Sequence, residues 1–171
     1  MKVFIISSLI ALACAGMAQA QQPQEAKINM AGIKGSFKFT PLAGKLKGAK
    51  VTVSIEKGLT KKFAVMPNVG FQYHIHLNRV GPGNDCMATG GHLDPTNVGK
   101  HGNLLPSMTG AIKQFEYVDD QLEFTGKATT IVGRSVVIHN NGTRVACANL
   151  LPVKQPIKIG RKKNKGILGG L

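Results

Sequence analysis

Residues 33–40 read IKGSFKFT, and residues 51–56 read VTVSIE. In both stretches apolar or small residues alternate with polar ones, so an extended chain would carry one apolar and one polar face. This period of two is typical of a β-strand that packs on a core with one face and meets water with the other. The two stretches therefore predict strands of a half-buried sheet.

Further strand patterns follow along the chain, and turn residues separate them. We predict strands over residues 71–78, 115–118, 122–126, 134–139 and 143–150. Clusters of Gly, Pro and Asn at residues 81–84 and 140–142 mark turns between them. No convincing amphipathic helix and no internal repeat interrupts this series. The sequence thus predicts an all-β fold, an eight-stranded antiparallel Greek-key barrel or sandwich.

Composition limits the class of protein more than it limits the function. The chain has 171 residues, which is the size of one domain, and 43% of them are hydrophobic, which excludes a disordered chain. The formal net charge of +14 favours binding of small anions, acidic polysaccharide, nucleic acid or anionic membrane. Charge alone does not choose among these partners.

The N-terminus has the form of a secretory signal. Lys2 precedes an apolar run over residues 3–15, and Ala18-Gln19-Ala20 forms a small-x-small cleavage site. The run is too short to span a membrane, and no later run of that kind reaches 18 residues. We expect a signal peptide over residues 1–20, a leader over 21–32, the barrel over 33–151 and a basic flexible tail over 152–171. The protein would be secreted, or periplasmic in a bacterium.

Removal of the signal peptide changes the cysteine count. Cys86 and Cys147 then remain in a chain that is exported to an oxidising compartment. Two such thiols most simply form one disulfide, which would close a loop of about 60 residues. Two separate buried thiols are the alternative.

Histidines carry the clearest chemical signal. Residues 71–78 read FQYHIHLN, and the strand period puts His74 and His76 on the face opposite Phe71, Tyr73, Ile75 and Leu77. His139 ends another predicted strand, and His92 lies in a loop. A set of imidazoles without thiolate suits copper, zinc or nickel, and a near-planar set of four suits Cu(II). Three histidines with an open position would suit a hydrolytic zinc, so these residues leave the metal open.

Several motifs together resemble the copper/zinc superoxide dismutase family. They are HIH at 74–76, Cys86, GHLDP at 91–95, SVVIH at 135–139 and TRVACAN at 143–149. The resemblance covers residues 35–151, and KHGN at 100–103 is most similar to the copper-only branch of fungi and oomycetes. It implies a copper-dependent enzyme that converts superoxide to O₂ and H₂O₂ by cycling between Cu(II) and Cu(I).

The resemblance also implies roles for individual residues. It gives the copper ligands as His74, His76, His92 and His139. His92 would also carry a proton to the product, and Arg144 would guide and hold superoxide. A disulfide between Cys86 and Cys147 would pin the loop of the active site to the barrel.

Departures from the family pattern are equally informative. Only eight residues separate His92 from His101, and the usual zinc-binding sequence is missing, so Asp94 and His101 alone would not form a zinc site. We expect copper without zinc, and we interpret His101 as a loop residue rather than a ligand. The long charged loop before Arg144 is replaced by a short turn at residues 140–142. No acidic residue matches the one that holds the bridging imidazole in copper-only relatives.

This missing acid keeps other functions open. A non-enzymatic copper-binding protein, or a polyanion-binding extracellular protein on the same fold, are the alternatives. A zinc hydrolase lacks a recognisable general base. A polyanion of the heparin or cell-wall kind would bind through the tail residues Lys154, Lys158, Arg161, Lys162, Lys163 and Lys165. The nine lysines between Lys27 and Lys62 would attract superoxide. We expect no nucleic-acid partner, and we interpret the Asn141 sequon as a turn.

Overall fold

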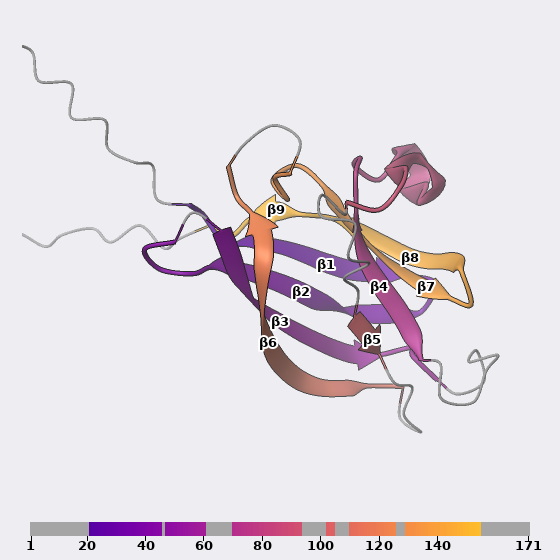
Figure 1. Cartoon of the computed structure of the whole chain (residues 1–171). Coiled ribbons are helices and arrows are strands. Elements are labelled where there is room, and N and C mark those ends of the chain that lie inside the picture. Colours follow the sequence, from indigo (N-terminus) through magenta and orange to yellow (C-terminus); the bar gives the residue numbers. More distant parts are fainter. Residues whose placement is uncertain are drawn as a thin grey trace, which may run out of the picture.

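The computed structural model describes residues 21–45, 47–60, 70–93, 102–104, 110–125 and 129–154. The expected signal peptide, His101, Asp94 and the tail beyond Lys154 lie outside these ranges. Within them, the chain forms two antiparallel sheets that face each other (Figure 1). The all-β prediction is confirmed.

Among the described residues, five strands form the first sheet and four form the second. The first sheet has the order β6-β3-β2-β1-β9, with bounds β1 (Gln24–Met30), β2 (Ile33–Pro41), β3 (Lys47–Lys57), β6 (Ile112–Glu123) and β9 (Leu151–Pro152). The second has the order β5-β4-β7-β8, with bounds β4 (Phe71–His76), β5 (Gly102–Leu104), β7 (Ser135–Asn140) and β8 (Thr143–Asn149). Two short 3₁₀ turns, η2 (Pro82–Asn84) and η3 (Met87–Thr89), lie between β4 and β5.

Connections between the sheets give the fold its topology. After the meander β1-β2-β3, the chain crosses to β4 and β5, returns to place β6 beside β3, and crosses again to place β7 beside β4. Such returns to a non-sequential neighbour are typical of Greek-key sheets. They bring β4 and β7, which carry three of the five histidines, side by side.

The core forms where the inward faces of the two sheets meet. On β2 and β3 the alternation that the sequence shows becomes a burial pattern, with Phe37, Phe39 and Val53 fully buried. Phe37 packs across the core on Tyr73 of β4, with 4.7 Å between ring centroids. Burial of each large apolar side chain contributes about 1.5–3 kcal/mol. These contacts hold one face of β4 against the first sheet, so the other face of β4 points outward.

A pair of tyrosines joins β4 to β6. The hydroxyl groups of Tyr73 and Tyr117 lie 2.6 Å apart, and Tyr73 is 3% exposed whereas Tyr117 is 37% exposed. Burial raises the pKa of Tyr73 well above its ordinary value, with a smaller contribution from Tyr117. Tyr73 therefore stays protonated, and its hydroxyl is satisfied within the barrel.

Three strands differ from the prediction. Residues 24–30, expected to belong to a leader, form β1, which pairs with β2 throughout its length. Residues 112–123 form one continuous strand, although a break was expected near Asp119 and Asp120. Pairing with β3 holds β6 extended through these acidic residues. Strand β5 lies in a stretch that has no strand pattern, and it pairs with the edge of β4.

The connection between β7 and β8 is short, as the sequence predicts. Asn140 pairs with Thr143, and Asn141 and Gly142 have φ angles of 48° and 77°. Positive φ at both central positions is the mark of a type I′ hairpin turn, which Asn-Gly favours. No long loop precedes Arg144, so its strand begins directly beside β7.

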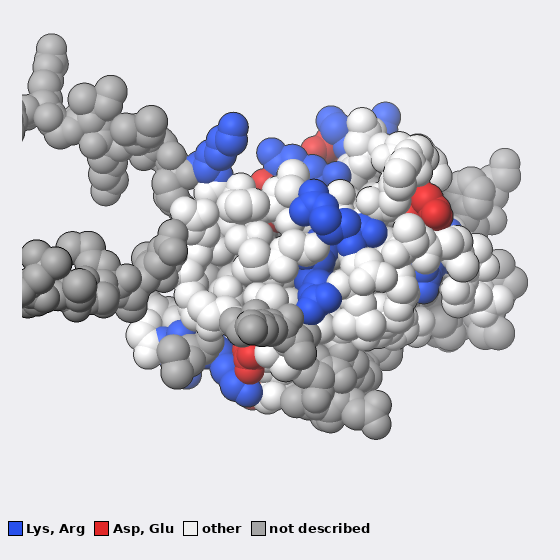
Figure 2. Space-filling model, turned by 90° about the horizontal axis from the view of Figure 1, so that it is seen from above, with Lys and Arg blue, Asp and Glu red and all other residues white. Residues whose placement is uncertain are grey.

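Many of the lysines on the first sheet have acidic partners. Lys34 pairs with Glu56 at 2.8 Å, Lys47 with Glu123 at 2.8 Å, and Lys50 with Glu116 at 3.3 Å. Figure 2 shows the basic and acidic side chains on one face of the molecule. Salt screens exposed charges beyond about 10 Å at 0.1 M. These lysines belong to the first sheet, whereas the histidine strand β4 belongs to the second. They therefore attract anions to the histidines less than their number suggests.

Candidate metal centre

His74 and His76 point outward from β4 but are not exposed to solvent. Their relative exposures are 9% and 0%, because the loop that follows β4 folds back over this face. The prediction that they share one strand face is confirmed, with 6.2 Å between ring centroids. Leu77, expected on the core face, is instead 39% exposed, because β4 ends at His76.

His139 reaches the same site from β7. The residue pairs with Gln72 across the sheet, beside an irregularity in the β7–β8 register between Ile138 and His139. Its Nε2 lies 3.0 Å from Nε2 of His76, and its exposure is 6%. The neighbouring strand therefore supplies the third imidazole of the cluster.

His92 comes from the loop rather than from a strand. The loop runs back along the end of β4, where Leu77 N–H donates to Gly91 O at 3.0 Å and Leu93 N–H donates to Ile75 O at 2.8 Å. This backbone pairing places the exposed His92 ring edge-on to His74, with 3.7 Å between centroids and 89° between planes. The ring thus closes the site on its solvent side.

The four imidazoles form one cluster. Each offers one nitrogen, and these nitrogens all lie within 4.8 Å of one another. The members are His74, His76, His92 and His139, which are the four histidines predicted as ligands.

Lone pairs in this cluster favour a bound cation. His76 Nδ1–H donates to Gly90 O at 2.9 Å, so neutral His76 carries its lone pair on Nε2. His139 Nδ1 faces Gly142 O at 3.4 Å, which directs the lone pair of its Nε2 toward His76 in the same way. Two nitrogen lone pairs at 3.0 Å repel each other unless a cation lies between them. With metal–nitrogen bonds of about 2 Å, this spacing subtends roughly a right angle at the metal, as two adjacent ligands would.

Burial favours the neutral form of two of these imidazoles. It lowers the pKa of His76 to about 4, and the neighbouring His92, Arg144 and His139 lower it further, against the hydrogen bond to Gly90. Burial likewise lowers the pKa of His139. A neutral imidazole is the form that binds a metal ion. His76 and His139 are therefore in the metal-binding form at neutral pH.

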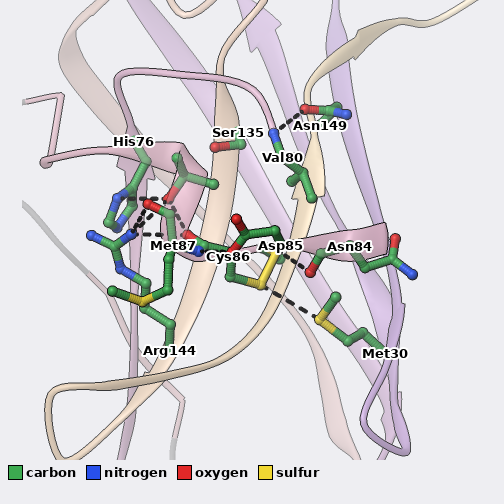
Figure 3. Close-up of a disulfide and its surroundings, with 12 residues drawn as sticks. Met30, His76, Val80, Asn84, Asp85, Cys86, Met87, Ser135, Arg144 and Asn149 are labelled. Carbon is green, nitrogen blue, oxygen red and sulfur yellow. Dashed lines mark hydrogen bonds between the residues drawn. A yellow bond between two sulfur atoms is a disulfide. The ribbon is translucent and has the colours of Figure 1, made fainter. Parts of the chain in front are cut away.

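Arg144 lies next to the histidines and holds the loop. Its Nη1 donates to Cys86 O at 2.8 Å, to Met87 O at 3.0 Å and to Thr89 Oγ1 at 3.2 Å. Its Nη2 donates to Gly90 O at 2.6 Å. Figure 3 shows the guanidinium beside His76. Because a guanidinium has five N–H groups, the Nε–H and one Nη2–H have no hydrogen bond within the described part of the chain.

The predicted disulfide joins the same loop to β8. Cys86 and Cys147 are bonded, with 5.8 Å between their Cα atoms (Figure 3). Cys147 lies three residues after Arg144 on β8, so one strand anchors the loop twice. This anchoring positions Gly90 and His92, which come directly after the anchored segment.

Two residues of the site were not predicted. Thr89 is fully buried, and its hydroxyl donates to Cys86 O at 2.7 Å and lies 3.3 Å from His76 Nδ1. Gly90 has a φ of 71° and a ψ of −152°, a conformation that favours glycine. The Gly90-Gly91 pair before His92 was the available sequence signal for this turn.

Comparison with known proteins identifies the family. The family model described as copper/zinc superoxide dismutase (SODC) matches residues 33–152. This chain belongs to that family. In this chain, imidazoles from β4, β7 and the loop meet outside the barrel.

Similar proteins include two from Candida albicans. The chain is 33% identical over 143 residues to its cell surface Cu-only superoxide dismutase 5, covering 72% of this chain and 57% of that protein. It is 29% identical over 178 residues to the cell surface superoxide dismutase (Cu-Zn) 4, covering 88% and 71%. The chain thus spans little more than half the length of the first relative.

Solved structures agree with the fold. The Cu(II) form of Candida albicans superoxide dismutase 5 aligns with a TM-score of 0.65 and 29% identity, over 80% of this chain and 95% of that one. The clock protein EA4 aligns with a TM-score of 0.60 at 23% identity, which shows a shared fold alone. The described residues contain no helix with the length and apolar character needed to cross a membrane.

Proposed function

We propose that this chain is a secreted, copper-dependent superoxide dismutase that works without zinc. The observation that carries the proposal is the cluster of four imidazole nitrogens within 4.8 Å, next to the guanidinium of Arg144. Membership of the dismutase family and the names of the Candida relatives support the same activity. All-nitrogen ligation by imidazole suits copper.

The ligand roles divide by position. His74, His76 and His139 are held by strands and buried, so they would keep a copper ion in place throughout the reaction. Bound copper would supply the redox step, in which one superoxide is oxidised to O₂ and a second is reduced, with the uptake of two protons, to H₂O₂. His92 is the exposed ligand, and it would pass a proton from solvent to the reduced product.

Arg144 would select and orient the anion. Its four backbone and side-chain contacts use Nη1 and one N–H of Nη2, which leaves Nε–H and the other Nη2–H to donate to superoxide. A fixed cation beside the redox site favours O₂⁻ over neutral O₂. It also raises the rate of encounter, an effect that salt weakens.

The proposal that the chain binds copper without zinc depends on the sequence. The segment between His92 and His101 is short, and Asp94 and His101 lie outside the described residues. Secretion rests on the signal-like residues 1–20 and on the cell-surface relatives. The basic tail from Lys154 to Lys165 would bind an extracellular polyanion.

Reconstitution tests the proposed activity. The mature chain is loaded with Cu(II), freed of unbound metal, and mixed with superoxide while the decay of the radical is followed. We expect one copper per chain and decay far faster than with the metal-free chain. Stoichiometric copper uptake without turnover would instead indicate a copper-binding protein that is not an enzyme.

A further inference from the structure

A groove lies on the side of the disulfide away from the metal centre. Its volume is about 570 Å³, and it runs between β1 and the chain from β8 through β9 to Lys154. In Figure 3, Met30 and Asn84 of this groove lie across the disulfide from His76 and Arg144. Volumes of 300–1,000 Å³ are typical of ligand sites. The proposed dismutase reaction makes no use of this groove.

The polar side chains that line the groove, apart from Glu25, are two lysine cations and three asparagine amides. They belong to Lys27, Lys154, Asn29, Asn84 and Asn149. Asn149 Oδ1 already accepts the backbone N–H of Val80 at 2.8 Å, so its NH₂ group is what it offers a ligand (Figure 3).

A single acidic side chain, that of Glu25, is among the described residues that line the groove, and it lies 3.5 Å from Lys27 Nζ. Two lysines against one glutamate leave the charged side chains of the lining with a net positive charge, which favours a negatively charged ligand.

The apolar part of the groove limits the class of ligand further. It is formed by Met30, Val80, Leu151, Pro152 and Val153, and Leu151 is 50% exposed. The described lining includes no aromatic side chain, so a nucleic acid would find no platform on which its bases could stack. The C–H groups of a pyranose ring can pack on such aliphatic side chains while its anionic substituent meets the lysines.

The groove also lies where the basic tail begins. Lys154 lines the groove and is the last described residue, and residues 155–171 contain five more Lys and Arg and no acid. Figure 2 shows Lys and Arg side chains along the middle of one face, with few acidic ones among them.

We propose that this groove is a binding site for an acidic polysaccharide. One or two pyranose units would occupy it, with a carboxylate or sulfate group between Lys27 and Lys154 and hydroxyl groups on the asparagine amides. The proposal goes beyond dismutase activity and does not depend on bound copper. Its occupant is an acidic glycan, and the anionic group on the sugar is the feature that the groove recognises.

Binding of defined hexasaccharides tests the proposal on the full mature chain. The probes are an oligogalacturonate, a heparin hexasaccharide and uncharged maltohexaose, measured by calorimetry with and without copper. We expect at least one acidic probe to bind, maltohexaose not to bind, and copper to make no difference. Lys27→Gln with Lys154→Gln should weaken binding about tenfold, because two charge-assisted contacts of about 0.7 kcal/mol each are lost.

A matched variant distinguishes binding in the groove from attraction by the overall positive charge of the protein. Lys34→Gln with Lys57→Gln removes the same charge from the same sheet, outside the groove, and should weaken binding less than about twofold. In a labelled chain, the side-chain amide of Asn149 should shift when the acidic probe is added. Three results would each overturn the proposal. They are an equal loss of affinity in the two double variants, binding of maltohexaose, and a loss of affinity only when the tail residues from Lys158 to Lys165 are changed to Gln. Superoxide decay, measured on the same samples, tests the proposed function separately.

Discussion

Arg144 and His76 donate hydrogen bonds to one and the same oxygen atom. Arg144 Nη2 reaches the carbonyl oxygen of Gly90 at 2.6 Å, and His76 Nδ1 reaches it at 2.9 Å. A proposed metal ligand and the cation that would attract the substrate are therefore positioned by a single turn. A movement of this turn would change the orientation of both side chains. The loop is therefore as important as the strands for the geometry of the site.

Removal of Arg144 should slow turnover without releasing the metal. We expect Arg144→Ala to lower the rate of superoxide decay several-fold and to flatten its dependence on ionic strength, because the fixed cation is lost. Copper content should stay at one per chain, since Arg144 is not a ligand. Rates over a range of salt concentrations and metal analysis check both points.

An exposed arginine near the site provides the control for Arg144. Arg79 lies three residues after His76, and Arg79→Ala removes the same charge. Its effect on the rate should be small. Loss of copper in Arg144→Ala, or an equal loss of rate in Arg79→Ala, would show that the role of Arg144 is misassigned.

Removal of one strand-held imidazole should abolish copper-dependent activity. His139→Ala leaves His76 Nε2 without its neighbour at 3.0 Å and leaves three ligands. We expect copper-dependent turnover to disappear while the far-ultraviolet circular dichroism of the barrel is unchanged. Gln72→Ala, at the residue that pairs with His139 on β4, is the control and should retain copper. A stably loaded and active His139→Ala protein would contradict the site.

Stability of the metal-free protein should fall as the pH is lowered from about 6.5 to 4. The pKa of His76 is lowered to about 4 in the folded protein, against 6.5 as the ordinary value. In this range the unfolded chain binds more protons, so its formation becomes more favourable as the pH falls. Urea unfolding at pH 7.5, 5.5 and 4.5 should show a decline on the order of 2 kcal/mol. The decline should be smaller in His76→Gln, and an equal decline in that variant would refute this explanation.

Loss of the disulfide should weaken both the fold and the metal site. Cys86 and Cys147 are 61 residues apart, and the loop-entropy model gives about 4 kcal/mol for such a link. Cys86→Ser with Cys147→Ser should lower the unfolding free energy accordingly. Copper affinity should also fall, because the loop that holds Gly90 and His92 loses an anchor. A copper affinity equal to that of the parent chain would show that Arg144 alone positions the loop.

Strand patterns and the histidines of the cluster could be predicted because each depends on local sequence. The alternation around Phe37 and the HIH motif at 74–76 specify which face is apolar, and the structure confirms both. The first strand was missed although Ala26 and Ile28 alternate with Lys27, because the strand begins with the polar residues Gln24 and Glu25, which pairing with β2 holds extended. The length of β6 was missed for a similar reason, since its pairing with β3 extends across Asp119.

The surroundings of the site could be predicted less well than its four histidines. Burial of His74 and His76 depends on where the loop folds, and that depends on contacts between Arg144 and carbonyl groups distant in the sequence. Thr89 and Gly90 take their roles from the same contacts. The ion pairs of Lys34 and Lys50 likewise depend on which strands are neighbours. Tertiary contacts of this kind are difficult to predict from a single sequence.

The most direct test of the central claim is the coordination of Cu(II) in the reconstituted chain. Electron paramagnetic resonance with electron spin echo detection identifies imidazole nitrogens bound to copper. One copper per chain, bound by the imidazoles of His74, His76, His92 and His139, is the expected result. A spectrum that is unchanged when any one of these residues is replaced by alanine would contradict the account.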